Sequence, residues 1–318
     1  MKKNEYLLTV VIPAYNAEDT IERAIKSVIE PCKTGIELII VNDGSTDATK
    51  NKCKCLVKKI GEDRVVLVDQ ENSGHGSAIN IGIQRARGKY LKILDADDYY
   101  DADGLRQLVR IIRDNDSDLI INNYNTCSIN SDERSLVKWS NELEEEKEYD
   151  YKDVITKTKA TLLPFATVKT ELLRKNNCIV DIKCYYDDRE YDYFIMLFAK
   201  TVFYSSSSVY VYMVNNDEQS ISKKGLIKHI KDHAKVVRWL VLRYYADEMD
   251  DVKRKYIFNE VLVPLCYLQY HISIYYKRSR KDFIQFDRFL KDYPGLYDHN
   301  GVVGVRIKLH RLTKGVFI

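Results

Sequence analysis

The chain has 318 residues, of which 45% are apolar and 31% charged, enough for one large domain or two modest ones. No apolar run approaches the roughly 18–20 residues that span a bilayer, and the apolar stretch near the N-terminus is too short for a signal peptide, so we expect a cytoplasmic protein. The net charge of +3 is uneven, because residues 223–318 hold 20 Lys and Arg against 10 Asp and Glu. The seven cysteines are scattered without a Cys-x-x-Cys pair, which predicts neither a zinc site nor a disulfide framework.

Short apolar runs alternate with helical patterns over the first 125 residues. The runs predict strands at Leu7–Pro13, Glu37–Asn42, Val65–Asp69, Tyr90–Leu94 and Asp118–Ile121. Between them, periodic apolar positions predict helices at Thr20–Glu30, Asp47–Ile60, Ser77–Ala86 and Gly104–Arg113. This alternation predicts an α/β fold with right-handed βαβ units and a mostly parallel, Rossmann-like sheet covered by helices on both faces.

The rest of the chain changes character twice. Residues 130–153 are polar and predict an exposed insertion, with a strand around Ser135–Trp139. After Ser222 a helical pattern continues to about Leu290. We therefore expect one domain over residues 1–222 and a helical, basic region over residues 223–318. That excess of positive charge fits either an anionic partner, such as a membrane surface, or simply solvated helix faces.

Polar clusters follow four of the predicted strands, at the edge of the sheet where open α/β folds bind ligands. Asp95-Ala96-Asp97-Asp98 is the sharpest, because three carboxylates this close would repel unless a cation joined them. Oxygen ligands suit Mg²⁺ or Mn²⁺, which would also grip a diphosphate; a plain turn and helix cap is the alternative.

The cluster Asp43–Asp47 supplies a carboxylate that can accept a hydrogen bond from the N3–H of uracil. A plain strand-turn-helix with Asp47 as the cap is the alternative. The first predicted strand is followed by neither a Gly-x-Gly-x-x-Gly fingerprint nor a Walker loop, which argues against NAD enzymes and P-loop NTPases.

Four segments, Val11–Asn16, Val41–Asp47, Asn72–Gly82 and Gly88–Asp98, together resemble the family 2 glycosyltransferases in order and spacing. That family has the GT-A fold. The resemblance implies an inverting transferase that uses a nucleotide diphosphate sugar, with UDP favoured, and a divalent metal, Mn²⁺ or Mg²⁺. Its usual context is the synthesis of surface or capsular polysaccharide.

The resemblance also implies roles for individual residues. It assigns nucleotide-sugar binding to Pro13, Tyr15, Asn16, Asp43, Asn72, His75 and Asp95. Asp97 would hold the metal together with Asp95, and Asp98 would be a supporting residue or a further ligand. Many relatives carry an Arg where this chain has Ile79, which leaves one phosphate-facing charge unaccounted for. His75 and Lys92 are the candidate substitutes, with His75 as a loop-packing residue the alternative.

The second half of the first domain resembles the family less closely. Tyr185–Tyr191 resembles the acidic motif that supplies the catalytic base, and we favour Asp188, with Asp187 and Glu190 as rivals and a helix cap as the alternative. Gln219–Ser222 resembles a later segment near the donor phosphates. Aromatic side chains that could stack on an acceptor sugar are Tyr124, Phe165, Tyr185 and Tyr186.

On this interpretation residues 1–125 bind the nucleotide sugar and residues 126–222 bind the acceptor, a glycan or a lipid-linked molecule. The segment Arg306–Lys314, with apolar residues interleaved from Val302 to Leu312, predicts a surface helix that contacts the inner face of the membrane. Nucleic-acid binding is not expected, since the acidic first part has no contiguous basic groove. The alternative functions are a nucleotidyltransferase and a non-catalytic nucleotide-sugar-binding protein.

Overall fold

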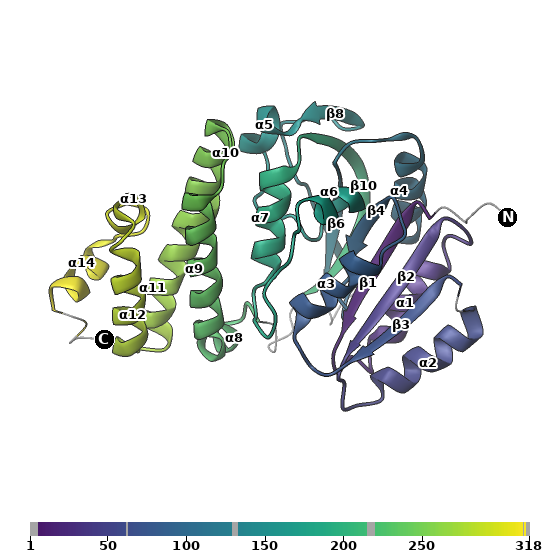
Figure 1. The fold of residues 1–318 in the computed structure, drawn as a ribbon, viewed down its shortest axis with the longest axis horizontal. Helices are drawn as coiled ribbons and strands as arrows, with labels where there is room; N and C mark the ends of the chain where they lie inside the picture. Colours follow the sequence, from purple (N-terminus) through teal and green to yellow (C-terminus); the bar gives the residue numbers. More distant parts are fainter. Residues whose placement is uncertain (1–5, 62, 129–132, 215–219, 314, 316–318) are drawn as a thin grey trace. The chain divides into compact units, whose positions relative to one another are not determined.

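A computed structural model describes residues 6–61, 63–128, 133–214, 220–313 and 315. The chain divides into two compact units, Met1–Asn215 and Asn216–Ile318, which are coloured purple to teal and green to yellow in Figure 1. In the described residues, no helix is both long enough and apolar enough to cross a bilayer.

Ten strands of the described chain form one sheet in the first unit. Its main path is β3-β2-β1-β4-β9-β6-β10-β5, with β7 paired to β6 and β8 paired to β10. The strands are β1 (Leu8–Ala14), β2 (Ile36–Asp43), β3 (Val65–Gln70), β4 (Tyr90–Ile93), β5 (Tyr99–Tyr100), β6 (Leu119–Ser128), β7 (Arg134–Val137), β8 (Lys147–Asp150), β9 (Ala166–Lys169) and β10 (Thr201–Val214).

The predicted α/β class is confirmed. The first four strands lie side by side and parallel, because β3 pairs with β2, β2 with β1, and β1 with β4 in parallel register. The strands that complete the sheet make it mixed: β9 runs antiparallel to both β4 and β6, whereas β10 runs parallel to β6. The predicted strand at Asp118–Ile121 is longer than expected and continues to Ser128.

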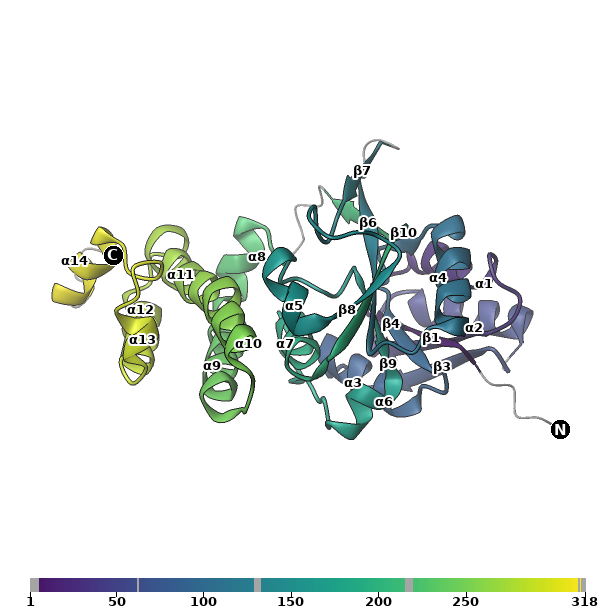
Figure 2. The same ribbon diagram turned by 90° about the horizontal axis from the view of Figure 1, so that it is seen from above.

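Helices cover both faces of this sheet, as Figure 2 shows. On one face, α1, α2 and α4 pack with Val10 and Ile12 of β1 in a single apolar core. On the other face, α3 approaches β1 so closely that a Cβ on Gly82 would lie 2.5 Å from the Val11 methyl groups. The helices of this unit are α1 (Ile21–Ile29), α2 (Thr49–Ile60), α3 (His75–Arg85), α4 (Ala102–Asp114), α5 (Tyr151–Val154), α6 (Thr170–Lys175) and α7 (Asp188–Phe198).

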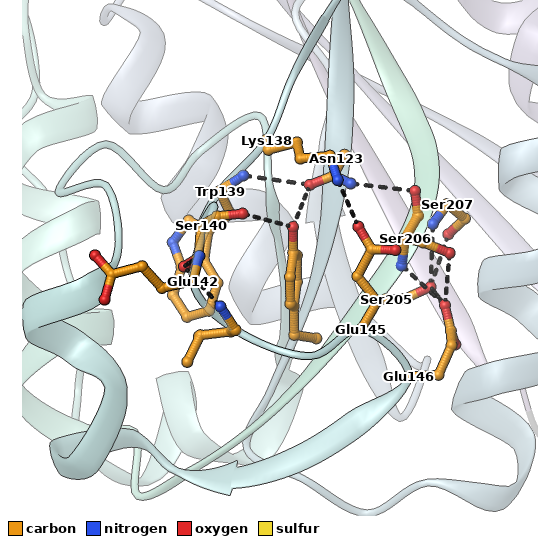
Figure 3. Close-up of polar contacts among 12 residues, drawn as sticks. Asn123, Lys138, Trp139, Ser140, Glu142, Glu145, Glu146, Ser205, Ser206 and Ser207 are labelled. Carbon is orange, nitrogen blue, oxygen red and sulfur yellow. Dashed lines mark hydrogen bonds and ion pairs between the residues drawn. The ribbon is translucent and has the colours of Figure 1, made fainter.

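The predicted insertion, residues 130–153, follows β6, contains β7 and β8 and reaches the start of α5, and its residues 130–132 are outside the described part. The expected strand is β7, but Trp139 is buried rather than exposed. Asn123 Oδ1 accepts hydrogen bonds from the Trp139 N–H at 3.2 Å and from the Tyr204 hydroxyl at 2.9 Å (Figure 3). Glu146 Oε1 accepts from the Ser206 N–H at 2.8 Å, at an irregularity in β10. The insertion is therefore fixed to the sheet at Trp139 and at Glu146.

The second unit is helical, as the sequence predicts. Two π-helical turns, Ile257–Leu262 and Ile272–Tyr276, continue α10 and α11. Arg311 joins the last helix to the rest of the unit, because its guanidinium bonds Asp287 Oδ1 at 2.7 Å. The helices are α8 (Lys223–Lys228), α9 (Ile230–Ala246), α10 (Asp251–Tyr256), α11 (Val263–His271), α12 (Arg280–Leu290), α13 (Pro294–Tyr297) and α14 (Val305–Leu312).

Candidate functional site

The loops after β1 and β2 are joined to each other. Asn16 has a left-handed φ of 47°, which Asn tolerates better than most residues. In that conformation its Oδ1 accepts from the Thr46 N–H at 2.8 Å, while its own N–H donates to Ser45 Oγ at 3.1 Å. The neighbouring Tyr15 ring is 52% exposed, whereas Pro13 is buried in β1. Tyr15 is thus free to meet a ligand.

Asp43, at the end of β2, organises the loop after β3. Its Oδ1 accepts from Gln70 Nε2 at 2.5 Å and from the Ser73 N–H at 2.7 Å, and its Oδ2 accepts from the Gly74 N–H at 2.8 Å. A carboxylate offers about four lone pairs, so roughly one remains on Oδ2. The Asp43 side chain is buried, and its hydrogen bonds hold this loop in its conformation.

The loop after β3 and helix α3 bind the segment that precedes α7 and hold it in place. Asn80 Nδ2 donates to the Val180 carbonyl at 2.9 Å, and the Val180 N–H returns a bond to Asn80 Oδ1 at 3.0 Å. The Lys183 N–H donates to the Ser73 carbonyl at 2.7 Å. A Cβ on Gly76 would lie 2.1 Å from the Asp181 carbonyl oxygen, so only glycine permits this approach.

His75 connects two acidic motifs that are far apart in the sequence. Its Nε2 lies 3.2 Å from Asp95 Oδ1, and its Nδ1 lies 3.0 Å from Asp187 Oδ2. Burial, the largest single influence, disfavours the charged ring, but the charges and hydrogen bonds of Asp187 and Asp95 together raise the pKa of His75 well above its ordinary value. The structure therefore places between the two motifs an imidazole ring whose protonated form both motifs favour.

The Asp95–Asp98 loop divides its carboxylates between solvent and protein. Asp98 is 1% exposed; its Oδ2 accepts from the Tyr210 hydroxyl at 2.6 Å and its Oδ1 from the Met213 N–H at 2.7 Å. Asp97 is exposed, and in the described chain no other residue donates to its carboxylate. Asp98 consequently anchors the loop to β10 rather than facing the site.

The pKa values of these carboxyls follow from that division. Burial first, and then the charges of Asp97 and Asp95, raise the pKa of Asp98 well above its ordinary value. Although Asp97 is exposed, the protein around it partly desolvates its carboxyl, and this effect, followed by the charge of Asp95, raises the pKa of Asp97 as well. The loop thus concentrates negative charge that its own residues do not offset.

The chemistry of these residues fits a divalent cation. In the described residues no three His, Cys, Asp or Glu side chains group closely enough to hold an ion by themselves. Mg²⁺ commonly uses one or two carboxylates and completes its shell with water and substrate phosphates. Asp95 and Asp97 can supply such a pair, because both reach solvent. After desolvation, the like charge of Asp95 raises the pKa of Asp97, against the opposing charges of Arg23 and His75.

The acidic motif at α7 likewise separates its carboxylates. Asp187 is buried against His75, and Glu190 is buried with its Oε2 accepting from the Asp181 N–H at 2.8 Å. The Asp188 side chain is 33% exposed, and its closest charged neighbour in the described chain is Arg189, whose Nε lies 3.6 Å from Asp188 Oδ2. Burial within the surrounding protein is the main cause that raises the pKa of Asp188. Among the three rivals, Asp188 has the carboxylate most open to a substrate.

Lys92 corrects one expectation. Its ammonium is fully buried and donates to the carbonyls of Pro164 at 3.1 Å and Ala166 at 3.0 Å. Burial lowers the pKa of Lys92 to about 7. Lys92 therefore cannot supply the phosphate-facing charge that Ile79 lacks, and His75 remains the candidate for it.

The other residues predicted from the sequence lie as follows. Asn72 is exposed in the loop after β3, beside Gly44. Tyr124 and Phe165 form an edge-on pair with centroids 4.7 Å apart, and Phe165 is buried, whereas Tyr185 is exposed. Ser222 caps α8 by accepting from the Gly225 N–H at 3.1 Å, and Gln219 lies outside the described residues.

Sequence reasoning missed two residues of this region. Tyr210 supports the Asp95–Asp98 loop from β10, and no motif in its neighbourhood signals that task. Arg189 lies between Asp188 and Asp192 on α7, and a signal for it existed, because Arg189 and Asp192 have the i,i+3 spacing of a helical ion pair.

A family model described as Glycosyl transferase family 2 matches residues 9–178, which is more than half of the chain. The chain is 33% identical over 117 residues to glycosyltransferase GlyA of Streptococcus pneumoniae, covering 37% of this chain and 16% of that protein. It is 37% identical over 134 residues to the succinoglycan biosynthesis protein ExoO of Rhizobium meliloti, covering 42% of this chain and 37% of that protein. The matches thus span less than half of either relative.

Solved structures share the fold over nearly the whole chain. TarS 1–349 of S. aureus in complex with UDP-GlcNAc superposes with a TM-score of 0.72 at 17% identity, covering 97% of this chain and 88% of that one. The mannosyltransferase PcManGT of Pyrobaculum calidifontis, in complex with GDP-Man and Mn²⁺, gives a TM-score of 0.53 at 17% identity, with coverage of 97% and 86%. The chain therefore belongs to glycosyl transferase family 2 and has the GT-A fold.

Proposed function

We propose that the protein is an inverting transferase that moves a sugar from a nucleotide diphosphate sugar, most simply a UDP-sugar, to an acceptor hydroxyl. The observation that carries this proposal is the arrangement around His75. A partly exposed carboxylate, Asp188, follows Asp187, and Asp187 is linked through His75 to Asp95 in the loop with the exposed Asp97. A proton acceptor and a cluster able to hold a cation therefore share one site.

On the donor side, the exposed Tyr15 ring offers a surface for the base of the nucleotide, framed by Pro13 and Asn16. The lone pair left on Asp43 Oδ2 can accept a hydrogen bond from that base, as the family resemblance suggests. The loop residue Asn72 and the cationic ring of His75 would face the ribose and phosphates. These assignments make residues 1–125 the donor half and residues 126–222 the acceptor half.

Asp95 and Asp97 would hold a Mn²⁺ or Mg²⁺ ion, whose positive charge would stabilise the departing diphosphate. Two complexes of fold relatives support donor and metal classes: one contains UDP-GlcNAc, and the other contains GDP-Man and Mn²⁺. His75, held between Asp95 and Asp187, would fix the position of the donor-side loop relative to the proposed catalytic base, Asp188.

The reaction at Asp188 is a single displacement. The acceptor oxygen attacks the anomeric carbon from the face opposite the diphosphate, and its proton passes to the Asp188 carboxylate. The bond between the anomeric carbon and the diphosphate oxygen breaks, and its electron pair leaves with the nucleoside diphosphate. A single displacement inverts the configuration. Asp188 suits this task because no hydrogen bond in the described chain occupies its carboxylate.

The decisive experiment is a donor screen with product analysis. The enzyme is incubated with UDP-, GDP- and dTDP-sugars in the presence of Mn²⁺ or Mg²⁺, with an EDTA arm, and the products are identified. Free nucleoside diphosphate that depends on the metal supports transfer. Pyrophosphate release would instead identify a nucleotidyltransferase, and donor binding without turnover would identify a binding protein.

We further propose that the acceptor is a glycan or a lipid-linked molecule of a surface polysaccharide, used at the inner face of the membrane. The exposed face of α14 supports this, because Val305 is 87% and Leu312 is 83% exposed, with Leu309 between them. Ile307, and Val302 and Val303 before the helix, are buried, so only part of the predicted apolar set faces outward. The exposed Arg306 and Lys308 would favour anionic lipid.

Vesicle sedimentation tests this contact. We expect the protein to sediment with phosphatidylcholine vesicles that contain phosphatidylglycerol, and a V305S/L309S/L312S variant to remain in solution. Leu242→Ser removes an exposed leucine from α9 and is the matched control. Equal sedimentation of the triple variant and the wild type would overturn the role of α14.

A further inference from the structure

Arg189, the second residue of α7, lies between two carboxylates of that helix. Its Nε is 3.6 Å from Asp188 Oδ2, and its Nη1 is 3.8 Å from Asp192 Oδ2. These residues have unlike surroundings, since the Asp188 side chain is 33% exposed and that of Asp192 is 1% exposed. Arg189 thus spans from the protein interior to the proposed base.

The interior end of this arrangement is fixed. Arg189 Nη1 donates to Thr161 Oγ1 at 2.8 Å, and Asp192 Oδ2 accepts from the Leu162 N–H at 3.1 Å. Both contacts reach the same short segment that precedes β9. The guanidinium therefore has little freedom to rotate, and its position relative to α7 is set by the core of the unit.

Most N–H donors of the Arg189 guanidinium make no hydrogen bond within the described chain. In the described chain, the bond to Thr161 is the one hydrogen bond that the guanidinium makes, so four of its five N–H donors remain available. The separation of 3.6 Å from Asp188 is an ion-pair contact rather than a hydrogen bond. It can orient the carboxylate electrostatically while leaving its lone pairs available to receive a proton.

The location also agrees with the acceptor side of the site. The phenol of Tyr212 on β10 lies within electrostatic range of Arg189, and the same phenol is within range of Asp98, Asp95 and Asp97. Arg189 and the Asp95–Asp98 loop therefore both lie near Tyr212 of β10.

We propose that Arg189 is a positioning residue for the transfer reaction: held by Asp192 and Thr161, its guanidinium orients the Asp188 carboxylate toward the oxygen of the acceptor. This inference rests on the proposed function, because it needs Asp188 to be the base. Arg189 would then be a fixed cation beside that base, and none of the sequence motifs described above indicates this role. Unspent N–H groups of Arg189 would then meet further oxygens of a polyhydroxylated acceptor.

The test uses water as the acceptor, so that no acceptor needs to be known. Hydrolysis of the best donor from the screen is measured for the wild type, R189Q, R189K, D188N and the control R106Q. Arg106 is an exposed residue on α4 whose ion pair with Asp103 lies on the surface. Binding of the matching nucleoside diphosphate and thermal stability are recorded for every variant.

We expect R189Q to lower kcat by about tenfold or more, with the donor KM changed by less than about twofold and R189K restoring part of the rate. Burial, Asp187 and Asp95 raise the pKa of Asp188, whereas Arg189 and His75 lower it. Because R189Q removes one of the two lowering charges, the acid limb of the pH profile should also move to higher pH in this variant. A purely structural role would lower nucleotide binding and thermal stability without this shift.

The outcomes separate the two proposals. If D188N is inactive while R189Q matches the wild type in kcat and pH profile, the role of Arg189 is wrong and the proposed function stands. If R189Q loses nucleotide binding together with turnover, Arg189 is structural and the inference is also overturned. If D188N turns over as fast as the wild type, or the wild type turns over no donor, the proposed function fails and the inference falls with it.

Discussion

The two acidic motifs of the site, Asp95–Asp98 after β4 and Asp187–Glu190 at α7, distribute adjacent carboxylates in the same way. In the first, Asp98 is buried and anchored while Asp97 is exposed. In the second, Asp187 is buried and anchored while Asp188 is partly exposed. Each motif therefore pairs a carboxylate that holds the loop or helix in place with one that is open to a ligand.

The two motifs differ in the groups that surround them. Asp98 is anchored by neutral donors, the Tyr210 hydroxyl and the Met213 N–H, and the His75 ring that contacts this loop at Asp95 is shared with Asp187. The α7 motif has the same His75 on one side and, in addition, Arg189 on the other. The first arrangement favours recruitment of a metal ion. In the second, Arg189 and His75 oppose the rise in the pKa of Asp188 that burial causes, and a carboxylate with a raised pKa suits a proton acceptor.

Asp188→Asn is the change that should break the second motif most completely. An amide cannot take the acceptor's proton, so we expect kcat to fall by about 10³-fold, within the range for loss of a general base. Nucleotide binding and thermal stability should change little, because Asp188 makes no hydrogen bond in the described chain. Donor turnover is the measurement, with the exposed Asp114→Asn on α4 as control. A variant that keeps a tenth of the wild-type rate would exclude Asp188 as the base.

Asp97→Ala is the corresponding change in the first motif. Removing one of the two proposed metal ligands should lower turnover by about 10³-fold, since a bound metal stabilises developing charge by several kcal/mol. Mn²⁺ binding, measured by calorimetry in the presence of the nucleoside diphosphate, should weaken in parallel. Unchanged Mn²⁺ affinity in the variant would contradict the assignment of Asp97, whatever happened to the rate.

Lys92 extends the comparison to a buried charge that has no acidic partner. Its pKa is about 7 in the folded chain and about 10.4 when unfolded, so between these values the unfolded chain binds more protons and stability rises with pH. Lys92→Met lacks this dependence. We expect the stability of the wild type relative to the variant to improve by about 3 kcal/mol from pH 7 to 9.5. Urea unfolding at both pH values measures it, and a constant difference would show that Lys92 titrates normally.

Much of the fold follows from local sequence signals. The first four strands and the helices between them were placed to within a few residues, because apolar runs and helical periodicity are strong where both faces of a sheet are covered. The strands β9 and β10 were not delimited. Their pairing partners are distant in sequence, and the serine run Ser205–Ser208 interrupts β10 where its register with β6 shifts.

The site was predictable in its residue types but not in their individual tasks. The spacing of Asp95, Asp97 and Asp98 could not tell which of them faces solvent, because that depends on Tyr210 and Met213, more than 110 positions later in the chain. Lys92 was misjudged for a similar reason. Its neighbours on β9 bury it, and nothing near it in the sequence reveals that pairing.

Tyr210→Phe tests the anchoring of Asp98, with the smallest of these effects. The change keeps the ring but removes the hydroxyl that donates to Asp98 Oδ2 at 2.6 Å and accepts from the Asp95 N–H at 3.3 Å. A hydrogen bond to a buried charged group contributes about 2 kcal/mol, so the free energy of unfolding should fall by about that amount. Tyr212→Phe is the matched control on the same strand, since its hydroxyl bonds no other residue in the described chain, and should cost less than about 0.5 kcal/mol. Equal stabilities for the two variants would mean that β10 does not hold the loop through Tyr210. The burial of Asp98 beside the exposed Asp97 would then need another cause.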